Sequence, residues 1–152
     1  MIIILLSILV GIILTLILLP LGYMAPEWIL LINIYWAIAL PTNNKLFLAF
    51  FSGYFVDILY GQVLGLTSLT FVIFIYIILR LYNSLRYMTV TQQMVIISFL
   101  ILIKQHFFIW SNYVLGIDSQ YFDLVISSLL SGLLWPPIYF ILRYIRRKFQ
   151  IS

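Results

Sequence analysis

The sequence predicts an all-α integral membrane protein, a single domain built as a bundle of six transmembrane helices. Of the 152 residues, 65% are hydrophobic and 8% are charged, and the mean hydropathy is +1.20. A soluble domain is about half apolar and about a quarter charged, so this chain has too few charged side chains to cover a water-soluble globule. The apolar residues also fall into six runs separated by short polar turns, which is typical of a multi-pass membrane protein.

The first two segments are predicted at residues 1–21 and 26–40. The first is a continuous apolar run of about the 20 residues that cross a bilayer. We expect it to be retained, because no Lys or Arg precedes it as in a cleaved signal peptide. Pro26 and Glu27 open the second segment, where proline is tolerated and an acid favours the positive end of the helix dipole.

The third segment is predicted at residues 46–60, after a turn that begins at Pro41. The second and third segments each have about 15 residues, or about 22 Å as a helix, against a membrane core of about 30 Å. Three arrangements would accommodate segments this short. They lie mostly inside the bundle, or their ends unwind, or they form a re-entrant pair that enters and leaves the membrane on the same side. The other segments are predicted at residues 64–80, 93–115 and 121–142, followed by a basic tail at residues 143–152.

The charged residues at the ends of these segments and in the connections between them separate by sign between the two sides of the membrane. Because cytoplasmic loops collect Lys and Arg, the sorting predicts that both termini are cytoplasmic. One set of connections holds Lys45, Arg80, Arg86 and the tail bases Arg143, Arg146, Arg147 and Lys148; the other holds Glu27, Asp118 and Asp123.

Several functional classes are disfavoured by the residue inventory. The chain has no cysteine and one histidine, so a thiolate nucleophile or a zinc site lacks its ligands. No GxSxG, HExxH or Walker-type loop occurs. We therefore expect no enzyme, no cofactor and no metal. The net charge of +4 does not indicate nucleic acid, since the bases lie at segment ends.

Away from the segment ends, three ionisable residues remain within the membrane: Asp57, Lys104 and His106. On a helix, Gly53, Asp57 and Gly61 share one face, which predicts a close helix contact with the carboxylate turned into it. Asp57 and Lys104 are expected about 18 Å from the same membrane surface, so we predict that they form a buried pair. The alternatives are a proton or ligand relay, or two groups that never meet.

Five stretches in order resemble the MreD family of bacterial rod-shape-determining proteins. They are APEWILLINIYWAIALP, SGYFVDILYGQVLG, the pair Gln92–Gln93, the position of Trp110, and GLLWPPIYFILRYIRRKF. The residues that carry the resemblance are Pro26, Trp28, Trp36, Pro41, Gly53, Asp57, Gly61, Gly65, Gln93, Trp110, Gly132, Trp135 and Pro136.

The resemblance implies a non-enzymatic scaffold of the cell-elongation complex, located in the bacterial inner membrane. Such a scaffold binds MreC and, with it, the RodA glycosyltransferase, a class B penicillin-binding transpeptidase and the MreB filament, and it supports lateral peptidoglycan synthesis. It also implies a fold similar to the substrate-binding subunits of energy-coupling-factor (ECF) transporters.

Two alternatives to the scaffold stay open. One is a small-molecule-binding transport subunit with a cavity near Asp57, Lys104 and His106, and the other is handling of a lipid-linked precursor. For a scaffold, the prolines and aromatics at residues 28–41 and 135–137 predict the surface that meets the partner. The basic tail is expected to contact anionic lipid, with a cytoplasmic protein as the alternative.

Overall fold

A computed structural model describes residues 2–42, 44–114, 116 and 121–150, and all regular structure within these ranges is helical. Six α-helices occur in the expected order, which confirms the all-α prediction. They are α1 (Ile2–Ile17), α2 (Trp28–Ala39), α3 (Asn44–Tyr60), α4 (Leu66–Tyr87), α5 (Val90–Val114) and α6 (Tyr121–Lys148), with a 3₁₀ segment η1 (Leu19–Met24) between α1 and α2.

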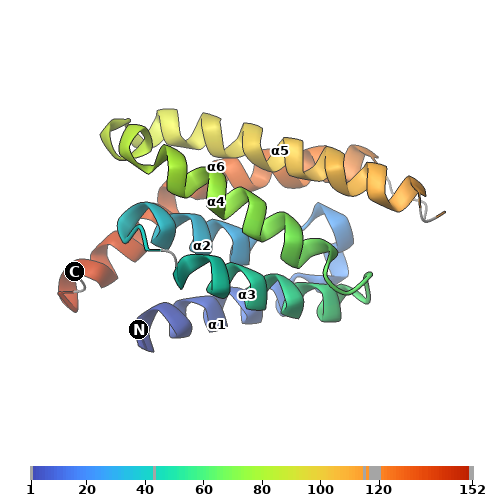
Figure 1. The fold of residues 1–152 in the computed structure, drawn as a ribbon, viewed down its shortest axis with the longest axis horizontal. Helices are drawn as coiled ribbons and strands as arrows, with labels where there is room; N and C mark the ends of the chain where they lie inside the picture. The colour runs from blue at the N-terminus through green and yellow to red at the C-terminus, as the bar shows by residue number, and fades with distance from the viewer. Residues whose placement is uncertain (1, 43, 115, 117–120, 151–152) are drawn as a thin grey trace.

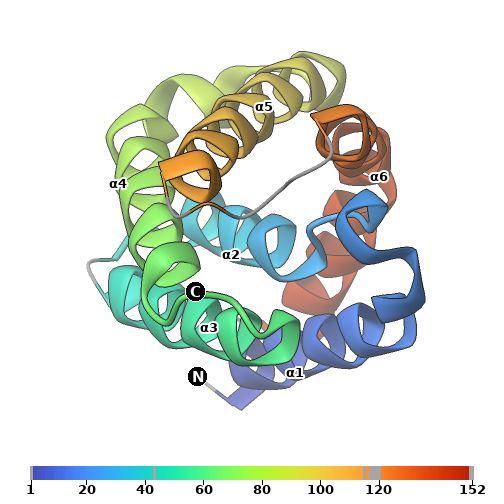
Figure 2. The ribbon, with the colours of Figure 1, turned by 90° about the vertical axis from the view of Figure 1, so that its right-hand side faces the viewer.

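Helix α2 lies at the centre of the bundle, with the other five α-helices around it (Figure 2). Ten of its twelve residues are buried. A helix that is apolar on every face is stable only when it is surrounded, and α2 is such a helix. Its few polar groups are paired: Trp36 Nε1 donates to Ser7 Oγ at 2.8 Å, and Asn33 Nδ2 donates to Ser52 Oγ at 2.9 Å. The second predicted segment therefore lies inside the bundle, which was one of the three arrangements expected for a helix this short.

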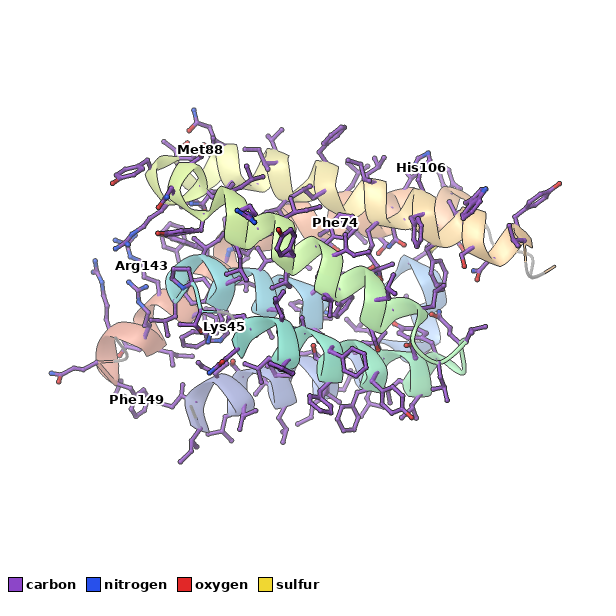
Figure 3. The ribbon with its side chains drawn as sticks, viewed as in Figure 1. Lys45, Phe74, Met88, His106, Arg143 and Phe149 are labelled. Atoms are coloured by element: carbon purple, nitrogen blue, oxygen red, sulfur yellow. The ribbon has the colours of Figure 1, made fainter. Side chains whose placement is uncertain are left out.

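The helices alternate in direction, so the connections gather at two ends (Figure 1). The start of α1 and the end of α6 lie at one end with the α2–α3 and α4–α5 connections. Lys45 and Arg143 are also there (Figure 3), and we call it the basic end. Segment η1, the α3–α4 connection and the start of α6 lie at the opposite end. Glu27 and Asp123 belong to that end, whereas Asp118 is outside the described residues.

Two helices extend further than predicted. Helix α4 continues past Arg80 to Tyr87, and α6 continues to Lys148, so all four bases of the predicted tail lie on its last turns. No glycine or proline interrupts either extension, and bases near a helix C-terminus are favoured by its dipole. Helices α4, α5 and α6 are long and apolar enough to cross a membrane. Helix α3, with 17 residues, is about 25 Å long.

Candidate functional site

A buried polar cluster lies at the opposite end of the bundle, where α2 begins. We call it the Glu27–Lys104 cluster; it consists of Glu27, Lys104, Gln105, Ser127 and Ser131. Lys104 of α5 forms an ion pair with Glu27 Oε1, and both side chains are largely buried, with 7% and 14% exposed. Gln105 Nε2 donates to the same oxygen at 2.9 Å. In this largely buried position, the ammonium and the carboxylate therefore balance each other's charge.

Helix α6 adds two serines to the cluster. Ser131 Oγ accepts from the Glu27 backbone N–H at 2.9 Å and donates to the Ser127 carbonyl at 2.7 Å. Ser127 Oγ donates to the Ala25 carbonyl at 2.8 Å. The backbone that leads into α2 has no helix partner of its own at these positions, so the serines satisfy polar groups that would otherwise be buried unpaired. The cluster thus joins α2 to α5 and α6.

A cavity of about 60 Å³ opens beside the cluster. Its polar lining includes Glu27, Lys104, Gln105 and Gln62, and its aromatic lining includes Trp28, Tyr60, Phe71 and Phe108. The Lys104 ammonium also lies 5.2 Å from the centre of the Phe71 ring. A cavity of about 150 Å³ holds one benzene molecule, so this one admits only a much smaller group.

Asp57 lies on α3, is fully buried and binds the start of α4. Its Oδ2 accepts from the Gly65 N–H at 2.9 Å, and its Oδ1 accepts from the Thr67 N–H at 3.0 Å. Ser68 Oγ also donates to Oδ2, at 3.4 Å. The first N–H groups of a helix have no partner within it, and the helix dipole favours an anion there. Asp57 therefore caps α4 from the neighbouring helix.

The predicted pair of Asp57 and Lys104 is wrong. Lys104 pairs with Glu27, which we had expected outside the bundle core, and Asp57 is satisfied by backbone N–H groups. The physical reason is that the start of α4 already neutralises the carboxylate, so no cation is needed. His106 belongs to neither group: its side chain is exposed on the outer side of α5 (Figure 3), with Nδ1 3.2 Å from the Leu102 carbonyl.

Gly61 does not lie on the helix face predicted for it. It follows the last residue of α3, with φ +60°, and its N–H donates to the Ile58 carbonyl at 3.3 Å. The next N–H, of Gln62, donates to the Asp57 carbonyl at 2.9 Å. These two bonds form a Schellman motif, which requires a left-handed residue and favours glycine. Gly65, with φ +98°, then precedes α4.

Gly53 and Gly132 do lie at close helix contacts. A Cβ at Gly53 would come within 2.6 Å of the Ser68 Cα on α4. A Cβ at Gly132 would come within 2.7 Å of the Ser98 Cβ, where α6 meets α5. Neither separation leaves room for a methyl group, so glycine allows these backbones to approach. For Gly53, the predicted close contact is confirmed, and its partner is α4.

The remaining residues of the MreD-like pattern divide between interior and surface. Gln93 joins three elements, because its Nε2 donates to the Leu85 carbonyl at 2.8 Å and its Oε1 accepts from Trp135 Nε1 at 3.2 Å. Trp36 and Trp135 are at most 1% exposed, so most of the region predicted to meet a partner is interior. Pro26 is buried, Trp28 and Pro136 are partly buried, and Pro41 and Trp110 are exposed.

The basic residues of α6 lie at the basic end. Arg146 Nη1 donates to the Ala39 carbonyl at the end of α2, at 3.3 Å, and so satisfies a C-terminal carbonyl of the central helix. The Arg143 guanidinium lies 5.8 Å from the Tyr139 ring centre. Arg147 and Lys148 are exposed. The last two are therefore available to lipid headgroups or to another protein.

Sequence reasoning missed Glu27 as the partner of Lys104, and it missed Gln105, Ser127 and Ser131 altogether. One signal was present: Ser127 and Ser131 are four residues apart in an apolar stretch, so they share a helix face. Glu27 carried no such signal, because its neighbour across the bundle is 77 residues away. Within the described ranges, no group of three metal-ligating residues occurs.

Comparison with known proteins agrees with the resemblance in the sequence. The sequence model of the rod shape-determining protein MreD family matches residues 1–145. The chain is similar to the rod shape-determining protein MreD of Haemophilus influenzae, at 28% identity over 135 residues, which cover 87% of this chain and 83% of that protein. No solved structure matches. With its long apolar helices, the chain is a multi-pass membrane protein, and it belongs to the MreD family of rod shape-determining proteins.

Proposed function

We propose that this protein is a non-enzymatic scaffold of the bacterial cell-elongation complex, with all six helices in the inner membrane and both termini in the cytoplasm. It binds MreC and, through it, the RodA glycosyltransferase, the transpeptidase and the MreB filament, and so supports lateral peptidoglycan synthesis. The observation that carries the proposal is that the buried polar side chains bind other parts of the same chain. Asp57, Lys104 and Gln93 each join one helix to another segment of the bundle. Such groups build a rigid body, which suits a scaffold.

The alternative, a transport subunit that resembles an ECF substrate-binding subunit, needs a pocket for a whole small molecule. Ligand pockets usually enclose a few hundred cubic ångströms or more. The cavity beside Glu27 and Lys104 has about 60 Å³, and large side chains such as Trp36, Trp135 and Phe71 fill the interior around α2. A filled interior favours the scaffold over the transport subunit. The larger hollow, between α3 and α4, lies on the outer surface and is lined mainly by exposed apolar side chains.

The surface that we assign to the partner is the apolar groove between α3 and α4. It has a volume of about 870 Å³ and is lined by Phe47, Phe50, Phe51 and Tyr76, among others, with Arg80 toward the basic end. The Arg80 guanidinium donates to Tyr76 Oη, at 2.9 Å from Nη2, and forms no ion pair within the described ranges. The occupant that fits is a single transmembrane helix with a carboxylate near its cytoplasmic end.

The test is a pull-down of the detergent-solubilised protein from its native host, with quantification of MreC. The double variant Phe47→Ala and Phe51→Ala should lower the recovered MreC about tenfold and produce rounded cells. The matched control is Leu129→Ala with Leu133→Ala, on an exposed face of α6, which should change neither. Recovery of an ATPase pair with a coupling membrane subunit, in place of MreC, would contradict the scaffold.

A further inference from the structure

The cavity beside the Glu27–Lys104 cluster has more hydrogen-bonding capacity than the chain itself uses. Glu27 accepts both of its hydrogen bonds at Oε1, and within the described ranges Oε2 accepts none. Among the described residues, Gln105 forms hydrogen bonds only through its Nε2, which leaves Oε1 as a second acceptor. An ammonium has three N–H donors, and Lys104 directs one of them to Glu27. Unused donors and acceptors therefore occur together in the wall of one cavity.

A neighbouring group also lacks a partner. Trp28 lines the same cavity, and its indole Nε1 is the one buried side-chain nitrogen or oxygen in the described ranges without a hydrogen bond. A buried donor without an acceptor costs about 1 to 3 kcal/mol, so native proteins rarely leave one. An acceptor that enters the cavity and reaches Nε1 would relieve this cost.

The size and charge of the cavity limit what can enter. About 60 Å³ has room for roughly four waters or for one group of side-chain size. The charges of Glu27 and Lys104 cancel, so an anion would face the carboxylate and a cation would face the ammonium. An uncharged group avoids both repulsions and the cost of burying an unpaired charge. The aromatic rings of Phe71 and Phe108 offer an apolar wall to its carbon atoms.

We propose that this cavity is a binding site for one small uncharged group that carries both a hydrogen-bond donor and an acceptor, an amide or a hydroxyl. Its acceptor oxygen takes N–H donors from Lys104 and Trp28, and its donor binds Glu27 Oε2 or Gln105 Oε1. The group comes either from a free small molecule or from a side chain of a polypeptide docked at this end. The proposal does not depend on the scaffold function.

The first experiment uses the purified full chain in nanodiscs, with ¹⁵N-labelled indoles and acetamide as the probe. The chain has four tryptophans, so the indole spectrum is simple, and Trp28→Phe identifies the resonance of Trp28. Acetamide should shift that resonance saturably and leave the exposed Trp110 unchanged. Acetate and methylammonium, which are similar in size but charged, should bind at least tenfold more weakly.

Two variants locate the site. Gln105→Met removes one acceptor and should weaken acetamide binding at least fivefold, whereas its exposed neighbour His106→Gln should not change it. A shift that rises linearly with acetamide, or that is equal for all indoles, means that the cavity holds water only. That result would overturn the proposal.

A second experiment identifies the source of the group. Because the chain has no cysteine, Gln62→Cys introduces a single thiol at the cavity wall. Saturating acetamide should slow its reaction with a small methanethiosulfonate in the purified protein at least fivefold, and an unchanged rate would contradict the proposal. If the thiol then reacts at least fivefold more slowly in native-host membranes than in heterologous membranes, the group belongs to a docked polypeptide. Equal rates in the two membranes assign it to a free small molecule.

Discussion

Asp57 and Glu27 are two buried carboxylates in the same bundle, and they are neutralised in different ways. Asp57 accepts from the N–H groups at the start of α4, from Gly65 and Thr67. Glu27 is paired with the Lys104 ammonium and also accepts from Gln105. The comparison teaches that an acid inside a helical membrane protein does not require a cation on another helix, because a helix N-terminus provides both the donors and the favourable dipole.

Among single substitutions, the comparison predicts the largest loss in the free energy of unfolding at Lys104. Lys104→Met keeps an unbranched apolar stem but leaves the Glu27 carboxylate buried without its cation. Removing one partner of a buried ion pair costs several kcal/mol, and Glu27 keeps some exposure, so the free energy of unfolding should fall by about 3 kcal/mol. Reversible unfolding by SDS in mixed micelles measures this change. The exposed Lys148→Met is the control, and an equal loss in both variants would refute the buried pair.

Asp57→Ala should have the next effect. It removes the acceptor of two backbone N–H groups at the start of α4, and a lost cap in a buried position costs about 2 kcal/mol. Asp57→Asn keeps one oxygen acceptor and should lose about half as much. The same unfolding measurement compares the two variants. If Asn and Ala are equally destabilising, the carboxylate does not act as a cap.

Gly61→Ala should have the smallest effect. No atom lies within 4 Å of the Cβ that alanine would add, so the cost is the strain of φ +60° alone, about 1 kcal/mol. A loss of 3 kcal/mol or more in the unfolding measurement would mean that Gly61 is packed against another helix, as its spacing first suggested.

Local sequence was enough to predict the helices but not their ends. Each helix is marked by a run of consecutive apolar residues, so six helices can be predicted from local sequence without knowledge of their neighbours in the fold. Gly61 is different, since glycine occurs both at helix contacts and at helix ends, and spacing does not distinguish the two. A similar uncertainty affects Arg80, which looked like the end of a segment and lies inside α4.

The partners across the bundle were not predictable from spacing. Asp57 and Lys104 were matched by their depth in the membrane, but depth says nothing about which helices are neighbours. Segment η1 returns the chain over the opposite end and carries Glu27 to α5, and no local pattern encodes that path. Buried pairs therefore require the fold, whereas the close packing of Gly53 could be read from the helix face alone.

The central claim, that Lys104 is paired with Glu27 and not with Asp57, is tested most directly by two double-mutant cycles. One combines Glu27→Gln with Lys104→Met, and the other combines Asp57→Asn with Lys104→Met, with SDS unfolding as the readout. We predict a coupling free energy of about 2 kcal/mol for Glu27 and Lys104, and less than about 0.5 kcal/mol for Asp57 and Lys104. A larger coupling in the second cycle than in the first would contradict the account.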